Sequence, residues 1–397
     1  MNVLCPCCKA YHWLGEQLKK SKKNQPTFGD CCLNGKIKLP VLQRPPPALH
    51  SLLIGDNVTS KEFREHIIGY NNALAFTSLG GKFDNSINQG RRGPWIYRLH
   101  GAMYHNSGGL LPREGKNPVY AQLYILDPRE ALRHRTHHNP DLNHVTLTDL
   151  QDMMIHHHQY ATIYKEAYKI AQDHVSQHPA HLADVQIRLH FAAGSDQRTH
   201  NLPTADEVAA IIPGDGSEHL DPRDVVLHLH TGQFQHIHDS HPAYQTLHFV
   251  LWFPYGEHGW HENILFADGR AGERKRISQS DYYAYRLYPR EGEADTLFRS
   301  GRLFQQWIVD SWATVEQDRL RFNKQNQEKL CADLYKGLVD AIPSDGNLDP
   351  NDIGKKYILP SSFTGSSRHM QQNFQDSMAI TRNYGKPDAF VTMTANP

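Results

Sequence analysis

The segment Cys5-Pro6-Cys7-Cys8 and the pair Cys31-Cys32 hold all but one of the six cysteines of this 397-residue chain. Cys5 and Cys8 have the two-residue separation of a zinc knuckle. A segment this short cannot bury a core of its own, but a tetrahedral metal site can hold it together. The sequence therefore predicts a zinc-binding module over residues 1–45, with Cys5, Cys8, Cys31 and Cys32 as ligands.

The fourth ligand of this module stays open at the level of sequence. Adjacent cysteines such as Cys31 and Cys32 share one metal ion awkwardly, so His12 and Cys7 are alternative ligands. A segment with five reduced thiols and no metal is the competing interpretation. Zinc is favoured over disulfides because the chain starts without a secretory signal, and thiols stay reduced in the cytosol and nucleus.

Composition describes an ordinary folded protein. Charged residues make up 21% and apolar residues 39%, and 42 Lys and Arg balance 42 Asp and Glu. A uniformly basic nucleic-acid binder is thereby excluded, whereas a locally basic face is not. Because no apolar run approaches the ~18 residues of a membrane span, we expect an intracellular protein, nuclear or cytoplasmic, with no membrane association.

The length favours two or three domains, and the pattern of elements predicts an α+β fold. A stiff spacer, Arg44-Pro45-Pro46-Pro47, follows the cysteine-rich module, and a mixed α+β region is expected over residues 46–275. Capping boxes predict helix starts at residues 59–62, 148–151 and 204–207. Strands are expected at residues 95–99, 120–126, 185–191 and 225–253, the last including the apolar run 249–253. Helices are expected over residues 301–341 and 367–383, before an alternating strand at 390–394.

Histidine is the compositional outlier, with 27 residues. The two motifs His228-Leu229-His230 and His236-Ile237-His238 are similar to the metal-binding half of HUH nucleases, which nick single-stranded DNA with a tyrosine. A hairpin turning at Thr231-Gly232 would pair His228 with Gln235 and place the two histidine pairs on opposite faces. We therefore do not expect the four imidazoles to share a metal ion.

Ordered blocks along nearly the whole chain resemble the N-terminal part of the Helitron transposase, a rolling-circle replication initiator fused to a helicase. The blocks are Cys5–Trp13 with Cys31–Pro40, Ala121–Asp127, His241–Tyr244, Leu251–Gly256, Gly301–Gln306, Leu359–Phe363 and Phe390–Pro397. The resemblance implies a Helitron helicase-like domain of the HUH/Rep type over residues 281–397. In that family the metal motif, the catalytic tyrosines and the helicase follow the strand that ends at Pro397. The resemblance therefore implies a truncated domain without catalytic residues, and residues 385–397 are expected to pack poorly.

The resemblance also implies DNA, in single-stranded form, as the partner. Basic side chains that could contact phosphates are Arg299, Arg302, Arg319, Arg321, Lys324 and Arg368. Tyr282, Tyr283 and Tyr285 could stack on unpaired bases. The sequence has no G-x-x-x-x-G-K-[ST] loop, so no ATP site is expected.

Three functions remain in competition. The leading one is a noncatalytic DNA-binding or DNA-positioning part of a Helitron transposase. The second is a metal-dependent single-strand nuclease that uses His228, His230 and a tyrosine. The third is a domesticated protein-interaction module that has lost its contact with DNA. Manganese-dependent nicking of single-stranded DNA would distinguish the nuclease from the noncatalytic DNA-binding part. Salt-dependent binding to single-stranded DNA would distinguish the DNA-binding part from the protein-interaction module.

Overall fold

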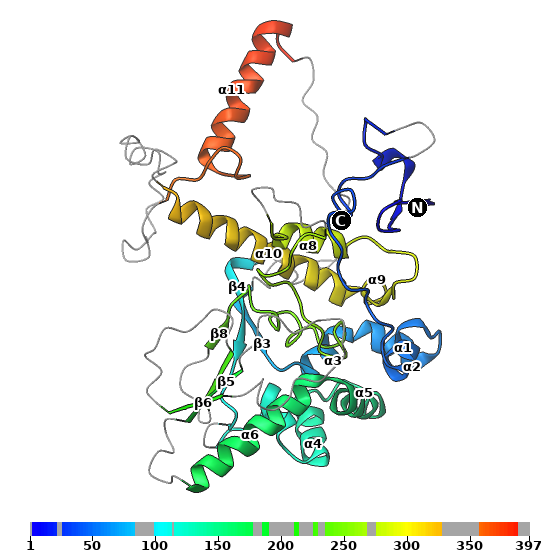
Figure 1. The fold of residues 1–397 in the computed structure, drawn as a ribbon, viewed down its shortest axis with the longest axis vertical. Helices are drawn as coiled ribbons and strands as arrows, with labels where there is room; N and C mark the ends of the chain where they lie inside the picture. The colour runs from blue at the N-terminus through cyan, green and yellow to red at the C-terminus, as the bar shows by residue number, and fades with distance from the viewer. Residues whose placement is uncertain are drawn as a thin grey trace. The chain divides into compact units, whose positions relative to one another are not determined.

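A computed structural model describes residues 2–21, 26–83, 99–112, 115–177, 185–189, 210–213, 225–228, 235–267, 275–327 and 357–387. The fold is a mixture of helices and small sheets, as expected for an α+β protein (Figure 1). The predicted strand at residues 390–394 and the helix start at 204–207 lie outside the described residues. No helix in the described part of the chain has the length and apolarity needed to cross a membrane.

The chain divides into two compact units. Unit 1 comprises residues 1–82 and 99–312, and unit 2 comprises residues 83–98 and 313–397. The elements of unit 1 that precede the long helix α10 are β1 (Val3–Leu4), β2 (Tyr11–His12), η1 (Leu14–Glu16), α1 (Pro47–Ile54), α2 (Val58–Glu65), α3 (Ile67–Leu74), β3 (Ser78–Phe83), β4 (Leu99–Ser107), η3 (Tyr120–Tyr124), α4 (Pro128–His138), α5 (His144–His157), α6 (Gln159–Gln177), β5 (Val185–Leu189), β6 (Ala210–Pro213), β7 (Val225–His228), β8 (Gln235–Ile237), α8 (Gln279–Arg286) and α9 (Thr296–Arg299). The last residue of β3 already belongs to unit 2.

Asparagine side chains cap the N-termini of α2 and α5, where the sequence predicted threonine caps. The Asn57 carboxamide accepts the Ser60 N–H at 2.7 Å and caps α2, so the capping box predicted at Thr59 is wrong. Asn143 caps α5 in the same way, and the predicted Thr148 cap lies inside that helix, donating to the His144 carbonyl. The prediction at Thr148 failed because threonine also fits inside a helix when its hydroxyl bonds to a carbonyl one turn earlier.

Two segments expected to be strands are turns or short helix. Residues 120–124 form η3, a 3₁₀ helix whose residues 121–124 are buried. The apolar run at 249–253 belongs to a buried series of turns, in which Phe253 N–H donates to the Phe249 carbonyl at 3.2 Å. A short, fully buried apolar run carries no periodicity that separates a strand from a helical turn, which explains both errors.

The strands that the structure describes form three small sheets. β1 pairs with β2, β3-β4-β8 form a second sheet, and β6-β5-β7 form a third, with β5 antiparallel to both neighbours. β8 pairs with β4, placing Ile237 opposite His105. The predicted hairpin between residues 225 and 238 is therefore wrong, because β7 and β8 belong to different sheets.

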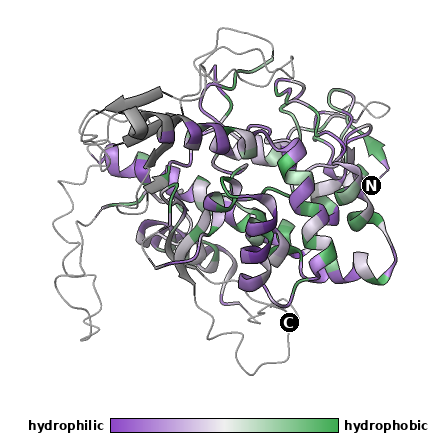
Figure 2. Ribbon diagram, turned by 90° about the horizontal axis from the view of Figure 1, so that it is seen from below, coloured by the Kyte–Doolittle hydropathy of each residue, from purple (hydrophilic) through white to green (hydrophobic). Residues whose placement is uncertain are grey.

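An aromatic core joins the helices of unit 1. Phe76 stacks on Tyr124 at 4.2 Å between ring centroids and contacts Tyr164 and His158 at 5.2 and 5.0 Å. Its backbone N–H donates to the Leu247 carbonyl, which attaches the buried turns to this core. Colouring by hydropathy shows hydrophobic and hydrophilic residues along the same helices, as helices with one buried face require (Figure 2).

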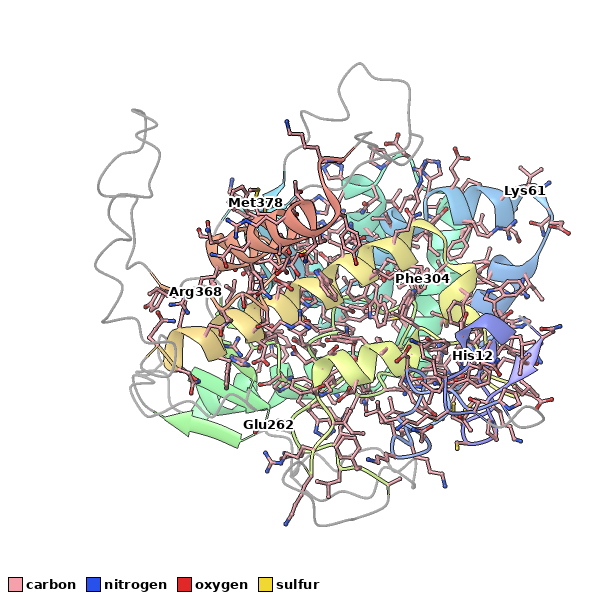
Figure 3. All side chains as sticks on the ribbon, turned by 90° about the horizontal axis from the view of Figure 1, so that it is seen from above. His12, Lys61, Glu262, Phe304, Arg368 and Met378 are labelled. Carbon is pink, nitrogen blue, oxygen red and sulfur yellow. The ribbon has the colours of Figure 1, made fainter. Side chains whose placement is uncertain are left out.

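The C-terminal helices follow the predicted pattern over the residues that the structure describes. α10 spans Arg302–Gln325, and its first part carries Phe304 and the buried Trp307, which lies 4.8 Å from Trp252 (Figure 3). α11 spans Ser367–Tyr384 and buries none of its residues. Its Met370, Phe374 and Met378 side chains are exposed.

Candidate metal centre

Four cysteines from two distant segments converge in the N-terminal part of unit 1. The Sγ atoms of Cys5, Cys8, Cys31 and Cys32 all lie within 4.8 Å of one another. Cys5 Sγ is 3.9 Å from Cys32 Sγ, Cys8 Sγ is 3.6 Å from Cys31 Sγ, and the two adjacent sulfurs are 3.8 Å apart. Among the described residues, these four cysteines are the side chains of metal-binding type that lie close enough together to hold a metal ion.

The sulfur spacing fits a tetrahedral metal. Zinc–sulfur bonds of about 2.3 Å in a regular tetrahedron place the sulfurs ~3.8 Å apart. The three distances above scatter around that value, including the one between the adjacent cysteines. The chain therefore presents four sulfurs close enough together to hold a metal ion.

Tight turns bring the four sulfurs together. Lys9 adopts a left-handed conformation with φ 60°, and its N–H donates to the Cys5 carbonyl at 3.0 Å. After the second pair, Gly35 has φ 85°, and its N–H donates to Cys32 Sγ at 3.2 Å. A backbone N–H directed at sulfur stabilises the thiolate form, which is the form that binds metal.

The four thiols influence one another strongly. Hydrogen bonds from Cys31 and then Cys32 lower the pKa of Cys8 to about 6 and also lower the pKa of Cys5. Hydrogen bonding to Cys32, Cys5 and Cys8 raises the pKa of Cys31. Without a cation, the first thiolates to form repel further negative charge and make the remaining thiols harder to ionise. A bound divalent ion would neutralise that charge and favour ionisation of all four.

The alternative ligands lie outside the cluster. His12 is buried, its Nδ1 lies 2.6 Å from a Glu16 carboxylate oxygen, and its ring stacks on Phe28 at 3.9 Å. Cys7 is exposed and faces Gly35, where an added Cβ would lie 3.3 Å from the Cys7 Cβ. The structure thus gives His12 an aromatic packing role and leaves Cys7 at the surface.

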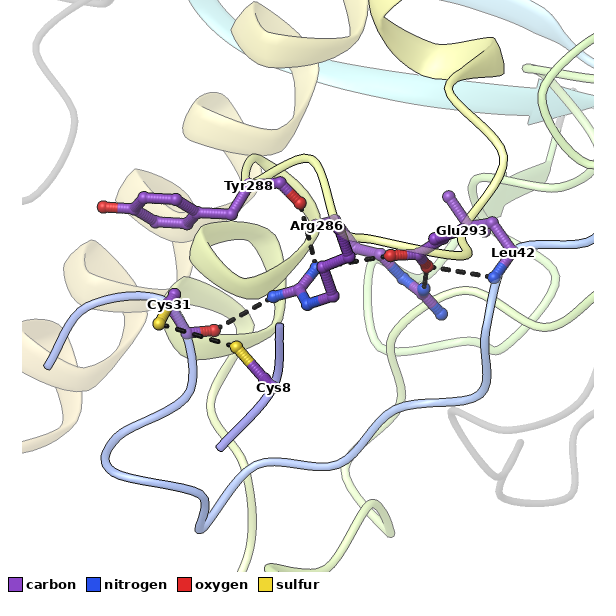
Figure 4. Close-up of polar contacts among 7 residues, drawn as sticks. Cys8, Cys31, Leu42, Arg286, Tyr288 and Glu293 are labelled. Atoms are coloured by element: carbon purple, nitrogen blue, oxygen red, sulfur yellow. Dashed lines mark hydrogen bonds and ion pairs between the residues drawn. The ribbon is translucent and has the colours of Figure 1, made fainter. Parts of the chain in front are cut away.

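The cysteine cluster packs directly on the segment that follows α8 (Figure 4). Arg290 donates from Nη2 to the Cys31 carbonyl at 3.1 Å and from Nη1 to the Tyr288 carbonyl at 3.0 Å. Its guanidinium carbon lies 3.4 Å from the centre of the Tyr285 ring. Backbone hydrogen bonds from Tyr11 to Pro289 and from Glu291 to Lys9 join the same two segments.

Glu293 completes this contact from the other side. Its carboxylate accepts from Arg286 Nη1 at 3.0 Å, lies 3.5 Å from Arg290 Nη1, and accepts the Leu42 N–H at 2.9 Å. The three charged side chains are at most 8% exposed. No sequence motif indicated this network, and its one signal was the aromatic and basic composition of residues 282–290.

Three of the six predicted DNA-contacting cations already have acidic neighbours. Arg299 lies 2.7 Å from Asp295, Arg319 lies 3.3 Å from Glu316, and Arg321 lies 3.3 Å from Asp318. Lys324 lies 5.3 Å from the centre of the Tyr357 ring. Arg302 is exposed at the start of α10, and Arg368 is on the first turn of α11 (Figure 3).

The tyrosines expected to stack on bases are part of the core. Tyr282, Tyr283 and Tyr285 are 2%, 5% and 6% exposed. The Tyr283 ring meets Trp307 edge to face at 5.6 Å, and Tyr285 lies beneath Arg290. The prediction that these rings contact bases is therefore wrong, because burial withholds their faces from any ligand.

The histidine motifs do not form a shared site on one hairpin. His228 ends β7, whereas His236 lies on β8 in the other three-stranded sheet. His230 lies outside the described residues.

Comparison with protein families identifies one region of the chain. Residues 282–397 match the family described as the Helitron helicase-like domain at the N-terminus. The predicted resemblance is thereby confirmed for this region, which begins inside α8, beside the contact with the cysteine cluster. A search of curated proteins finds no match to the chain.

Proposed function

We propose that this chain is a noncatalytic, DNA-binding part of a Helitron rolling-circle transposase and that its four-cysteine centre holds a structural zinc ion. The observation that supports this most is the packing of the centre on the first residues of the Helitron helicase-like domain. Arg290 and Glu293 lie inside the family match, and they contact Cys31 and Leu42, which lie outside it. The N-terminal module is thus built into the start of that domain.

The proposed role of zinc is structural because of the ligand set. Four cysteine sulfurs fill a tetrahedral shell and leave no position for water or substrate. When bound, zinc supplies four strong bonds that tie residues 5–8 to residues 31–32. The residues around it, Lys9, Gly35 and Arg290, hold the backbone of both segments in place.

A positioning role for DNA agrees with the placement of the histidines and tyrosines. His228 and His236, one from each motif that suggested a nuclease, lie in separate sheets, and the tyrosines of α8 are buried. The exposed Arg302 and Lys324 offer positive charge to phosphates, whereas Arg299, Arg319 and Arg321 would first have to leave their acidic partners.

The proposal is tested with the zinc-loaded full chain and a fluorescein-labelled oligothymidylate. Anisotropy should show binding whose affinity falls as salt rises, because phosphate contacts release counterions. Incubation with Mn²⁺ should give no tyrosine–DNA adduct on a denaturing gel. An adduct that disappears in a His228→Ala variant would establish the nuclease instead. Absence of DNA binding at low salt would leave the protein-interaction module as the function.

A further inference from the structure

A groove lined by basic residues lies between α4 and the beginning of α5, far along the chain from the cysteine centre. It has a volume of about 430 Å³, and the residues that line it are Arg129, Leu132, Arg133, Thr136, His137 and His144. Pockets of about 300–1,000 Å³ are the size that binds small groups. No acidic residue lines this groove.

The helix α4 presents this face because its opposite face is fixed in the core. Arg135 is 1% exposed, donates from Nε to the Ala73 carbonyl at 3.0 Å, and lies 4.7 Å from the centre of the Tyr124 ring. Ala131 is buried beside it. Positions 129, 133, 136 and 137 follow the spacing of one helical face, so anchoring Arg135 directs them to the groove.

The positive charges of the groove are poorly neutralised. Arg129 and Arg133 are exposed, and among the described residues the Arg129 side chain forms no ion pair. Arg133 lies 3.9 Å from Glu130, in a pair whose side chains are 74% and 49% exposed. A pair this open contributes little and yields readily to a better partner. The Asp127 carboxylate caps α4 through the Arg129 N–H, and Asp141 is exposed in the loop before α5.

One polar atom inside the groove also lacks a partner. Thr136 Oγ1 is buried as an atom and makes no hydrogen bond to any of the described residues. A buried hydroxyl without a partner costs free energy that a ligand oxygen would recover. Together with the arginines, it supplies donors suited to a phosphate oxygen.

The contrast with α9 and α10 decides which surface is the stronger anion site. Arg319 and Arg321 have carboxylate partners at 3.3 Å on their own helix, and Arg299 has Asp295, which precedes α9, at 2.7 Å. Arg129 has no such partner in the part of the chain that the structure describes, and Arg133 lies 3.9 Å from Glu130. A phosphate at the α4–α5 groove therefore displaces less internal pairing than a phosphate at α10.

We infer that the α4–α5 groove binds the phosphodiester backbone of single-stranded DNA. The inference rests on the DNA-binding function proposed above, and it places a phosphate contact outside the Helitron helicase-like domain. Arg129 and Arg133 contact the phosphate oxygens, and Thr136 donates a hydrogen bond. Backbone contacts of this kind add affinity without sequence preference.

The test compares two double variants of the zinc-loaded chain by anisotropy with labelled oligothymidylate. Arg129→Gln with Arg133→Gln should weaken binding about tenfold and lower the slope of log affinity against log salt by ~1.4, from two lost contacts. Arg319→Gln with Arg321→Gln removes the same charge from helix α10 and should weaken binding by less than about threefold. Circular dichroism should be unchanged in both, because all four side chains are at least partly exposed.

The outcomes separate this inference from the proposed function. If the unaltered chain binds DNA and the Arg129/Arg133 variant binds it equally well, the groove site is overturned and DNA binding stands. If the unaltered chain binds no DNA, both are overturned. A methylphosphonate oligonucleotide, which lacks backbone charge, should not compete for the groove. If thymidine monophosphate displaces the labelled oligothymidylate as well as an unlabelled oligothymidylate does, the groove is a mononucleotide pocket and the inferred backbone site is overturned.

Discussion

Arg290 donates a hydrogen bond to the backbone carbonyl of Cys31 at 3.1 Å, across 259 positions of sequence. The same guanidinium covers the Tyr285 ring and lies beside Glu293. A cation packed against the backbone of a sulfur cluster complements the negative charge that four thiolates and one Zn²⁺ carry together. Metal binding and the order of residues 279–293 are therefore expected to depend on each other.

The first prediction concerns metal content. Cys5→Ser or Cys32→Ser should abolish stoichiometric zinc binding, because each removes one of four ligands. Cys7→Ser is the matched control and should keep about one zinc per chain. Elemental analysis of the purified proteins measures this. Full zinc in the Cys32→Ser protein would show that another group completes the shell.

The second prediction concerns the contact between the centre and α8. Removal of zinc by a chelator should increase hydrogen exchange in residues 9–12 and 286–293, since their mutual hydrogen bonds depend on the folded cysteine turns. Amides of α5 should keep their protection. Unchanged exchange at 286–293 after metal loss would contradict the coupling.

The third prediction concerns the Arg290–Glu293 pair. Arg290→Met leaves the Glu293 carboxylate with one cationic partner in a nearly buried site, and we expect a loss of roughly 3 kcal/mol in unfolding free energy. Arg299→Met, at an exposed pair, should change stability by less than about 1 kcal/mol. Chemical denaturation provides both values. Equal effects of the two substitutions would rule out a special role for Arg290.

The fourth prediction concerns the tyrosines of α8. Tyr283→Ala should destabilise the chain by about 3–5 kcal/mol, because it empties the space beside Trp307. Tyr283→Phe should keep most of the stability and leave DNA affinity unchanged. A clear loss of DNA binding in a stable Tyr283→Phe protein would contradict this prediction and support a contact between Tyr283 and DNA.

The fifth prediction concerns pH. Burial lowers the pKa of His158 to about 3, and burial followed by the nearby His105 lowers the pKa of His248 to about 3. Free histidine has a pKa of about 6.5, so between these values the unfolded chain binds protons that the folded chain does not. The contribution of these two neutral histidines to the free energy of unfolding is therefore fully present above about pH 6.5. It is lost as pH falls toward 3. His158→Phe, whose ring can stack on Phe76, should reduce this loss in denaturation curves measured across that range.

Local chemistry explains why part of the structure was predictable. The spacing of Cys5, Cys8, Cys31 and Cys32 indicated a metal centre, and the helices at residues 302–325 and 367–384 followed their apolar periodicity. The Helitron-like region could also be identified from residue patterns. Ligand type, spacing and helical period act over short distances, so they can be read before folding is known.

Tertiary packing decided the remaining features. The run 249–253 and the tyrosines of α8 have the composition of strands and base-stacking residues, but the core takes up their apolar surface. Likewise, which arginines keep their charge available depends on where acidic side chains come to lie. Arg319 and Arg321 lie 3.3 Å from acids three residues away, whereas Arg133 lies 3.9 Å from Glu130. Arg129 and Arg133 also line a groove whose lining residues include no acid, since burial of Arg135 orients their helix. Burial is set by residues distant in sequence, so only the folded chain determines which side chains stay open to a partner.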